Sequence, residues 1–464
     1  MKKLFFSLTL GFIILFASCK KTGFIESPGA VLSFSADTLH FDTVFTSTGS
    51  VTQSFKIFNQ NDSKLRLSDI RLGGGSASAF KINVDGVSGT NFSNVELEPY
   101  DSVYVFVSVS INPNAVNLPF LLRDSILVNY NGNKKYMQLE AYGQNANFYR
   151  NRRITKDTTW NSNLPYVILG GVTVDSNVTL TINSGCKIFS HADAPFVVNG
   201  SLKVNGGQDE RNRVVFKGDR LDPGYRDLPA AWPGIFFSRL STNNTLNYAI
   251  IQNAYQGIIT EYAITANPKI VLNQCIIDNI YDAGITGFAS SIKATNCLIT
   301  NCGSNIVIAA GGNYSFDYCT VATYGNYFIN HKSPVLSISN ADAQGTTVAL
   351  SATFRNSIIY GEGGTVENEI LVQKKGSPPA SQYNVSFQNV LYKNKDDQAP
   401  ATFTNSLRNQ PPNFDTINIS RREYNFRLKA NSPAIDKAVS ISGINLDLDG
   451  KSRGINPDIG CYEY

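Results

Sequence analysis

The sequence is short of charge and of several side chains that carry chemistry. Only 16% of its 464 residues are charged and the formal net charge is +4, so no excess of basic residues points to nucleic acid as a partner. Three histidines and the absence of a CxxC pair argue against a zinc site. No helix-length segment separates the short β-like runs after residue 160, which excludes βαβ crossovers.

The residues that are abundant favour strands and turns. The chain contains 48 asparagines and 36 glycines, and 11% of its residues are aromatic. Aromatic and β-branched residues at this level exclude a disordered chain, while asparagine and glycine are typical of tight turns. We therefore expect an all-β protein, and its length suggests two to four domains.

The first 18 residues have the pattern of an export signal. Lys2 and Lys3 precede an apolar run over residues 4–16, and small residues follow. The run is too short to span a membrane, which indicates a cleaved signal peptide over residues 1–18.

The end of this signal, Leu15-Phe16-Ala17-Ser18-Cys19, resembles a bacterial lipoprotein lipobox. The resemblance implies that Cys19 is lipidated and that the membrane is a partner through this anchor. It also implies an outer-membrane lipoprotein on the periplasmic or the cell-surface face. The alternative is ordinary cleavage beside an incidental cysteine. Residues 19–30 contain glycine, serine and proline and are interpreted as a tether.

Residues 31–146 show short alternating strands at the spacing of a β-sandwich. Val103, Val105, Val107 and Val109 alternate with polar and aromatic residues, which predicts one buried and one open face. The string Phe55-Lys56-Ile57-Phe58-Asn59, with the apolar run that follows it, resembles immunoglobulin-like modules of the Hydin type. Such modules mostly serve as spacers or binding adaptors.

From residue 160 the sequence repeats with a period near 22 residues. Cys275, Cys297 and Cys319 are 22 residues apart, and each lies in a similar frame. A repeat of this length with short strands predicts a solenoid whose rungs stack about 4.8 Å apart. Equivalent residues then form columns. We predict an inward column of small residues (Ala249, Cys275, Cys297, Cys319, Ser357) and an inward column of aliphatic residues (Ile251, Ile277, Ile299, Val321, Ile359). A third column lies at a turn (Asn253, Asn279, Asn301).

The repeat resembles the right-handed parallel β-helix family that includes pectate lyases. The resemblance covers residues 160–464, from an opening coil at 178–188 to a closing coil that contains Asn431-Ser432-Pro433-Ala434 and Pro457-Asp458-Ile459-Gly460. It implies a right-handed parallel β-helix after the N-terminal β-sandwich. The cysteines are then packed core residues. Disulfides are the alternative, although in-register parallel strands suit them poorly.

The columns of residues that we expect to face outward contain few side chains that could catalyse a reaction. Asp278 is their only acid, whereas a glycosidase needs two facing carboxylates and a lyase needs several carboxylates with a base. No catalytic residue is therefore assigned. The outward apolar row of Ile250, Ile276 and Leu298 predicts a cover, either from the same chain or from a partner.

The strongest candidate site is the loop from Gly218 to Trp232, which combines aromatic and charged residues. Rings that stack on sugar faces, beside carboxylates and guanidinium groups that bind hydroxyls, suit carbohydrate. The candidate carbohydrate-binding residues are Asp222, Tyr225, Arg226, Asp227 and Trp232. The alternatives are a packed Trp232 and Asp/Arg pairs that are merely solvated.

No cofactor or metal is predicted, apart from a faint calcium turn at Asp447-Leu448-Asp449-Gly450. This turn lacks the spaced ligands and closing Glu of an EF-hand. The other interpretation is that its acids pair with Arg453 to close the last coil.

Three hypotheses follow for function. The first is a membrane-anchored β-helix that binds or displays polysaccharide or another envelope component without catalysis. The second is a polysaccharide lyase or glycoside hydrolase, and the third is a structural or adhesive surface protein. Stacked exposed aromatics would favour the first hypothesis, and acids clustered with Lys or Arg in a groove would favour the second.

Overall fold

The computed structural model describes residues 23–45, 50, 52–111, 120–263 and 267–464. It divides into two compact units, Met1–Asn145 and Ala146–Tyr464. The signal sequence and Cys19 lie outside the described residues. Strands dominate both units, and the described residues contain no helix with the length and hydropathy needed to cross a bilayer. Three short 3₁₀ turns are present: η1 (Gly75–Ala77), η2 (Glu210–Asn212) and η3 (Ala380–Gln382).

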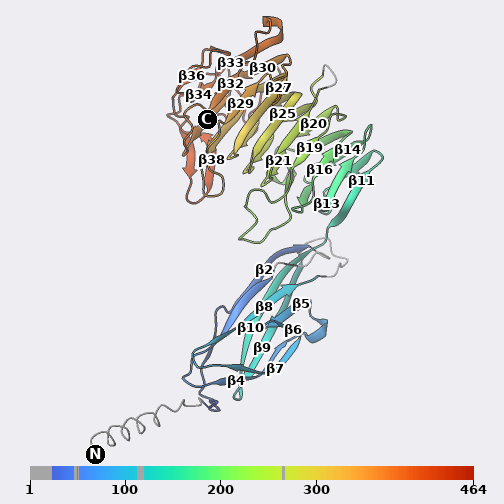
Figure 1. The fold of residues 1–464 in the computed structure, drawn as a ribbon, viewed down its shortest axis with the longest axis vertical. Coiled ribbons are helices and arrows are strands. Elements are labelled where there is room, and N and C mark those ends of the chain that lie inside the picture. The colour runs from blue at the N-terminus through green and yellow to red at the C-terminus, as the bar shows by residue number, and fades with distance from the viewer. Residues whose placement is uncertain (1–22, 46–49, 51, 112–119, 264–266) are drawn as a thin grey trace, which may run out of the picture. The chain divides into compact units, whose positions relative to one another are not determined.

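The N-terminal unit is a β-sandwich of two five-stranded sheets (Figure 1). Alternating residues such as Val105 and Val107 are fully buried between the sheets, as the period-2 pattern predicts. In spatial order, the first sheet contains β1 (Leu32–Phe34), β3 (Gln53–Asn59), β8 (Ser102–Val109), β5 (Phe80–Val84) and β6 (Val87–Gly89). The second contains β2 (Thr38–Phe45), β10 (Asn133–Gln144), β9 (Phe120–Tyr130), β4 (Leu65–Leu72) and β7 (Asn91–Leu97).

The described part of the predicted tether packs on the sandwich. Phe24 forms a β-bridge with Lys64, and the Arg66 guanidinium lies 4.1 Å from the centre of the Phe24 ring. The Asn131 amide also donates a hydrogen bond to the Ile25 carbonyl at 2.7 Å. Residues 24–25 are therefore held by the domain, because Phe24 and Ile25 can pack their apolar side chains against it.

The C-terminal unit is a parallel β-helix, as predicted, with 26 strands joined into one continuous sheet (Figure 1). The sheet begins at Asn147, earlier than residue 160. Its pairings form three stacks of parallel strands, which we name stacks A, B and C. Stack A contains part of β13 (Tyr166–Val174), then β16 (Phe196–Val198), β19 (Ile235–Phe237), β22 (Ile258–Glu261), β25 (Ala283–Thr295), β27 (Ser304–Asp317), β29 (Leu336–Ser339) and β32 (Ile370–Gln373).

The long strands β25 and β27 contribute their first halves to stack A and their second halves to stack B. Its other strands are β12 (Thr158–Trp160), β14 (Thr179–Asn183), β17 (Ser201–Asn205), β20 (Asn244–Asn247), β23 (Ile270–Asn273), β30 (Leu350–Arg355), β33 (Tyr383–Gln388) and β35 (Thr402–Thr404). Stack C begins with the first parts of β11 (Asn147–Ile154) and β13, while the second part of β11 pairs with the part of β13 that lies in stack A. It continues through β15 (Lys187–Ser190), β18 (Val214–Gly218), β21 (Ala249–Gln252), β24 (Ile276–Asp278), β26 (Leu298–Thr300), β28 (Thr320–Tyr324), β31 (Ile358–Glu362), β34 (Leu391–Tyr392) and β36 (Leu407–Arg408).

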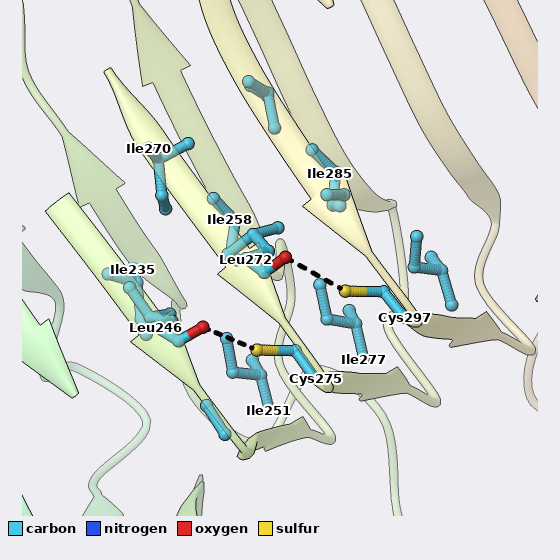
Figure 2. Packing of buried hydrophobic residues seen from close by; sticks show 14 of the residues in the cluster. Ile235, Leu246, Ile251, Ile258, Ile270, Leu272, Cys275, Ile277, Ile285 and Cys297 are labelled. Atoms are coloured by element: carbon cyan, nitrogen blue, oxygen red, sulfur yellow. Dashed lines mark hydrogen bonds between the residues drawn. The ribbon is translucent and has the colours of Figure 1, made fainter. Parts of the chain in front are cut away.

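The predicted inward columns form the core of the solenoid. Every residue of the small column and of the aliphatic column has no exposed surface. Figure 2 shows Cys275 and Cys297 packed among isoleucines, with their thiols directed at the carbonyl oxygens of Leu246 and Leu272. Cys302, outside the column, is also fully buried and donates to the Thr300 carbonyl at 3.1 Å.

All six described cysteines are free thiols, so none forms the disulfides of the alternative interpretation. Burial raises the pKa of the Cys186 thiol to about 11 and that of Cys461 to about 12. Since only the thiolate attacks a thiol reagent, the native protein from residue 20 onward should resist 5,5′-dithiobis(2-nitrobenzoate) at pH 8. We expect six thiols to react in guanidinium chloride and almost none before unfolding. Rapid native labelling, or fewer than six thiols after unfolding, would contradict this packing.

The outer surface of stack C is covered by the C-terminal residues 410–464, which we name the strap. The strap contains the antiparallel pair β37 (Phe414–Asn418) and β38 (Glu423–Leu428). Leu298 joins a hydrophobic cluster with strap residues, and Ile276 packs against it. The predicted cover therefore comes from the same chain.

Side chains at several of the turns that precede stack C strands bind the strap backbone. The Asn296 amide donates to the Leu446 carbonyl at 2.8 Å, and both Tyr318 and Asn356 donate to the Val439 carbonyl. These turn residues have positive φ angles, like their counterparts Tyr248, Gln274 and Asn389. The residues just before the stack C strands therefore form left-handed turns, and several of their side chains fasten the strap.

Candidate functional site

The predicted asparagine column holds the predicted loop. Asn253, Asn279 and Asn301 all have left-handed φ angles between 51° and 61°. The Asn253 amide donates to the Arg226 carbonyl at 2.8 Å, and the Asn279 amide donates to the Asp227 carbonyl at 3.0 Å. The loop backbone is thus fastened to two neighbouring rungs.

The amide ladder between these asparagines extends for one step. The Asn279 amide also donates to the Asn253 side-chain oxygen at 2.8 Å, as expected for a ladder. Asn301 instead donates to the Asp278 carboxylate at 3.1 Å. A carboxylate on the adjacent strand competes successfully with the amide because a charged acceptor forms the stronger hydrogen bond.

The candidate carbohydrate-binding residues have different environments. Asp222 forms an ion pair with Arg220 at 2.8 Å, and the Arg220 guanidinium stacks 3.7 Å from the centre of the Tyr225 ring. Arg226 and Asp227 pair at 3.3 Å on the exposed part of the loop. Tyr225 is 49% exposed, so one side of the loop stays open.

Trp232 differs from the other four candidates because it is buried. Its side chain is 1% exposed, and its indole nitrogen donates to the Gln252 carbonyl at 2.8 Å. No sugar can stack on this ring. The packed interpretation applies to Trp232, since the indole fills the solenoid interior where the loop rejoins the rung at β19.

The strap brings basic residues to the same place. The turn between β37 and β38 carries Arg421 and Arg422, and the Arg422 guanidinium donates to the Asp227 carbonyl at 2.5 Å. A pocket of about 250 Å³ lies between the loop, the asparagine column and this turn. We name it the ladder pocket; its lining residues are Asp227, Gln252, Asn253, Asp278, Asn279, Asn301, Asn326, Arg421, Arg422 and Tyr424.

The Asp278 carboxyl of the ladder pocket is shielded from solvent. Burial raises the pKa of its carboxyl above the ordinary value, while hydrogen bonds from Thr300 and Asn301 and the charge of Arg422 act in the opposite direction. The side-chain oxygen of Asn301 is buried without a hydrogen-bond partner. The pocket therefore offers a carboxyl group, guanidinium groups and an unused acceptor, which can bind a polyhydroxylated ligand.

Two neighbouring rungs each carry an exposed tyrosine shortly after the asparagine that lines the pocket. Tyr255 and Tyr281 follow Asn253 and Asn279 by two residues, and each is 49% exposed. Their ring centres are 5.6 Å apart and their planes differ by 26°, so the rings stack across neighbouring rungs. Beside them, Gln256 donates to the Asp282 carboxylate at 2.8 Å.

Sequence reasoning missed both the tyrosine pair and the arginines. The 26-residue offset that relates Asn253 to Asn279 also relates Tyr255 to Tyr281, so extending the columns by two positions would have found the pair. Arg421 and Arg422 lie outside the repeat, and no periodic signal links them to Asp278. Asp278 is the only acid of the aligned outward columns, but the loop and the strap bring Asp227 and Arg422 to the same pocket.

The described residues contain no group of three or more His, Cys, Asp or Glu side chains that could hold a metal ion. In the turn considered for calcium, one Asp447 oxygen accepts hydrogen bonds from the backbone of Asp449 and Lys451. Asp449 pairs with Arg427 and not with Arg453, whose partner is Glu463. The predicted pairing with Arg453 is therefore wrong, because Arg453 points into the buried end of the strap.

Comparisons with known proteins give no functional assignment. No family model and no curated protein matches the chain. Among solved structures, the catalytic domain of a GH87 α-1,3-glucanase, in complex with tetrasaccharides, is 13% identical with a TM-score of 0.24; the match covers 76% of this chain and 87% of that chain. A family 123 glycoside hydrolase from Clostridium perfringens is 12% identical over 25% of this chain and 26% of that chain, with a TM-score of 0.18.

A protein of unknown function from Porphyromonas gingivalis is 10% identical over 27% of this chain and 60% of that chain, again with a TM-score of 0.18. This chain thus spans about a quarter of the Clostridium hydrolase that it matches. With TM-scores below 0.5, these likenesses carry no argument about activity. What the protein does must be argued from its own side chains.

Proposed function

We propose that this protein is an exported, membrane-anchored β-helix that binds a polysaccharide without cleaving it. The observation that carries the proposal is the stacked and half-exposed pair of Tyr255 and Tyr281, which follow the pocket residues Asn253 and Asn279 by two positions. Apolar ring surface next to fixed polar groups is the usual composition of a ligand site. A polysaccharide repeats along its length, as do the rungs that present these rings.

The polar groups of the ladder pocket support the same ligand class. Arg421, Arg422 and the asparagine amides donate hydrogen bonds, while Asp278 and the unpaired Asn301 oxygen accept them. Sugar hydroxyls both donate and accept. Because the loop backbone is fastened by Asn253 and Asn279, the site is largely formed before the ligand arrives.

Replacing Tyr281 by alanine should weaken polysaccharide binding about tenfold, because it removes one ring of the pair. Tyr262→Ala is the matched control, since Tyr262 is 40% exposed on another part of the solenoid and packs against Phe288. A glycan array would identify the ligand, and calorimetry would then measure both variants. Equal binding by Tyr281→Ala and the unchanged protein would remove the proposed site.

Polysaccharide hydrolysis is the second candidate function, favoured by the carboxyl groups of Asp227 and Asp278 in one pocket. A raised pKa suits the Asp278 carboxyl to act as a general acid, and hydrolysis needs a second carboxylate. The discriminating assay is the release of reducing ends from each polysaccharide that binds. If the unchanged protein releases reducing ends and Asp278→Asn does not, the function is hydrolysis and not binding alone.

The membrane anchor belongs to the same proposal and depends on Cys19. Several acyl chains would hold the protein firmly, since each buried CH₂ contributes about 0.8 kcal/mol. Mass spectrometry of the mature N-terminus should find a lipidated Cys19. An unmodified N-terminus at another residue would show that the chain is secreted or held in another way.

A further inference from the structure

The two sheets of the sandwich differ in their content of acidic residues. Each of the five strands of the second sheet contains one acidic residue: Asp42, Asp69, Glu96, Asp124 and Glu140. None of the five strands of the first sheet contains any. We name the outward surface of β3, β8 and β5 the acid-free face.

The acid-free face carries an aromatic pair and two lysines. Tyr104 and Phe106 point outward from β8 and are 46% and 40% exposed, with ring centres 5.7 Å apart and planes 15° apart. Lys56, opposite Tyr104 on β3, lies 4.5 Å above the Tyr104 ring. Lys81 on β5 is exposed opposite Ser108. Cations and open ring surface therefore share one sheet surface.

A groove crosses this face beside Phe106. The strand register aligns Ser54, Phe106, Asn83 and Ser88 in one row across four strands. The groove has a volume of about 810 Å³, and its lining residues are Thr52, Lys81, Ile82, Asn83, Ser88, Gly89, Thr90, Phe106 and Ser108. Ring, ammonium and hydroxyl groups thus converge on a space that contains no acidic side chain.

Asn83 supplies an independent sign of a ligand. Its amide nitrogen donates to the Ser88 hydroxyl at 3.1 Å, but its side-chain oxygen is buried without a partner. An unpaired buried acceptor is costly unless a ligand supplies the donor. The occupant of the groove should therefore carry hydroxyl or amide donors as well as negative charge.

We propose that the acid-free face binds an acidic polysaccharide, a chain whose sugars carry carboxylate or sulfate groups. Lys81 pairs with the anionic group, the Phe106 ring packs against the apolar face of a sugar, and a hydroxyl group donates to the Asn83 oxygen. This site is separate from the ladder pocket and does not depend on it. The face has two lysines, whereas clusters that bind anionic membranes contain about four to eight basic residues.

The test uses the full chain from residue 20 and two probes that share one backbone, carboxymethyl-dextran and dextran. We expect binding to carboxymethyl-dextran that weakens with salt and is at least about tenfold tighter than binding to dextran. Lys81→Glu and Phe106→Ala should each weaken it about tenfold. The matched controls on β10 of the other sheet, Lys134→Glu and Tyr136→Ala, should stay within about twofold of the unchanged protein.

All proteins are also measured with the Tyr281→Ala change present, so that failure of this site is distinguished from failure of the ladder pocket. Equal binding by the β8/β5 variants and the β10 variants would overturn the proposal. It would also be overturned if Lys81→Glu and Phe106→Ala instead abolished binding to anionic phospholipid vesicles or to single-stranded DNA. A dimer that Phe106→Ala dissociates, without any polysaccharide binding, would assign the face to a second copy of the chain.

Discussion

Replacing Arg453 by methionine is expected to lower the free energy of unfolding by about 3–5 kcal/mol, because it leaves a buried carboxylate without its counter-charge. The Arg453 side chain is 2% exposed and pairs with Glu463, which is 8% exposed. Its guanidinium also donates to the Asn296 side chain and the Gly460 carbonyl, and lies 3.9 Å from the centre of the Tyr318 ring. One side chain thus joins the last residues of the strap to two rungs of the solenoid.

The matched control is Arg427→Met, which removes the other strap arginine that pairs with an acid. Arg427 and Asp449 are 49% and 40% exposed, so losing this pair should cost about 1 kcal/mol or less. Chemical denaturation followed by tryptophan fluorescence measures both variants. Equal losses would show that burial of the Arg453 pair does not matter.

The effect of Arg453→Met should also depend on pH. Burial already raises the pKa of the Glu463 carboxyl, and removing Arg453 raises it further. The folded variant then binds a proton more readily than the unfolded chain, so its stability falls as the pH rises through the folded pKa. The difference from the unchanged protein should shrink in acid, where Glu463 is neutral. A difference that stays constant from pH 7 to pH 4 would contradict this.

Replacing Trp232 by alanine should destabilise the solenoid by about 3–5 kcal/mol, because it empties a large volume in a packed interior. The indole is 1% exposed, and its donated hydrogen bond to the Gln252 carbonyl is also lost. The Trp232 carbonyl accepts the backbone N–H of Tyr255 at 2.7 Å, so the change should also loosen the rung that presents this tyrosine.

Tyr225→Ala in the same loop is the control for this second substitution. Tyr225 is 49% exposed and its ring stacks against the Arg220 guanidinium at the surface, so we expect a loss within about 1 kcal/mol. Thermal unfolding separates the two outcomes. A Trp232→Ala protein as stable as the Tyr225→Ala protein would mean that the interior can close around the missing ring.

Features that repeat could be predicted from the sequence. The 22-residue spacing of Cys275, Cys297 and Cys319 places them in one buried column. Asn279 and Asn301 each follow a cysteine of that column by four residues, and this position predicts their left-handed turns. Each rung imposes the same steric and hydrogen-bonding demands, so the residues that meet them recur at the same interval. The apolar outward row likewise predicts a cover, although it does not distinguish a segment of the same chain from a partner.

Features that depend on distant, unrepeated segments could not be predicted. Arg422 meets the loop at Asp227, 195 residues away, and Gln208 donates to the Asp449 carbonyl across 241 residues. No pattern at either position marks the other. The ladder pocket combines both kinds of feature, which is why its asparagines were expected and its arginines were not.

The strap should change how cooperatively the stacked rungs of the solenoid unfold. Rungs that touch only their neighbours unfold piecewise, since each interface contributes separately to stability. Here Lys437, Val439, Leu446 and Leu448 accept hydrogen bonds from Asn389, Asn356, Asn296 and Arg213, so one segment follows the stack backwards across many rungs. This long-range closure couples the rungs into one cooperative unit. It also raises the contact order, so the docking of the strap onto the rungs should be a slow step of folding.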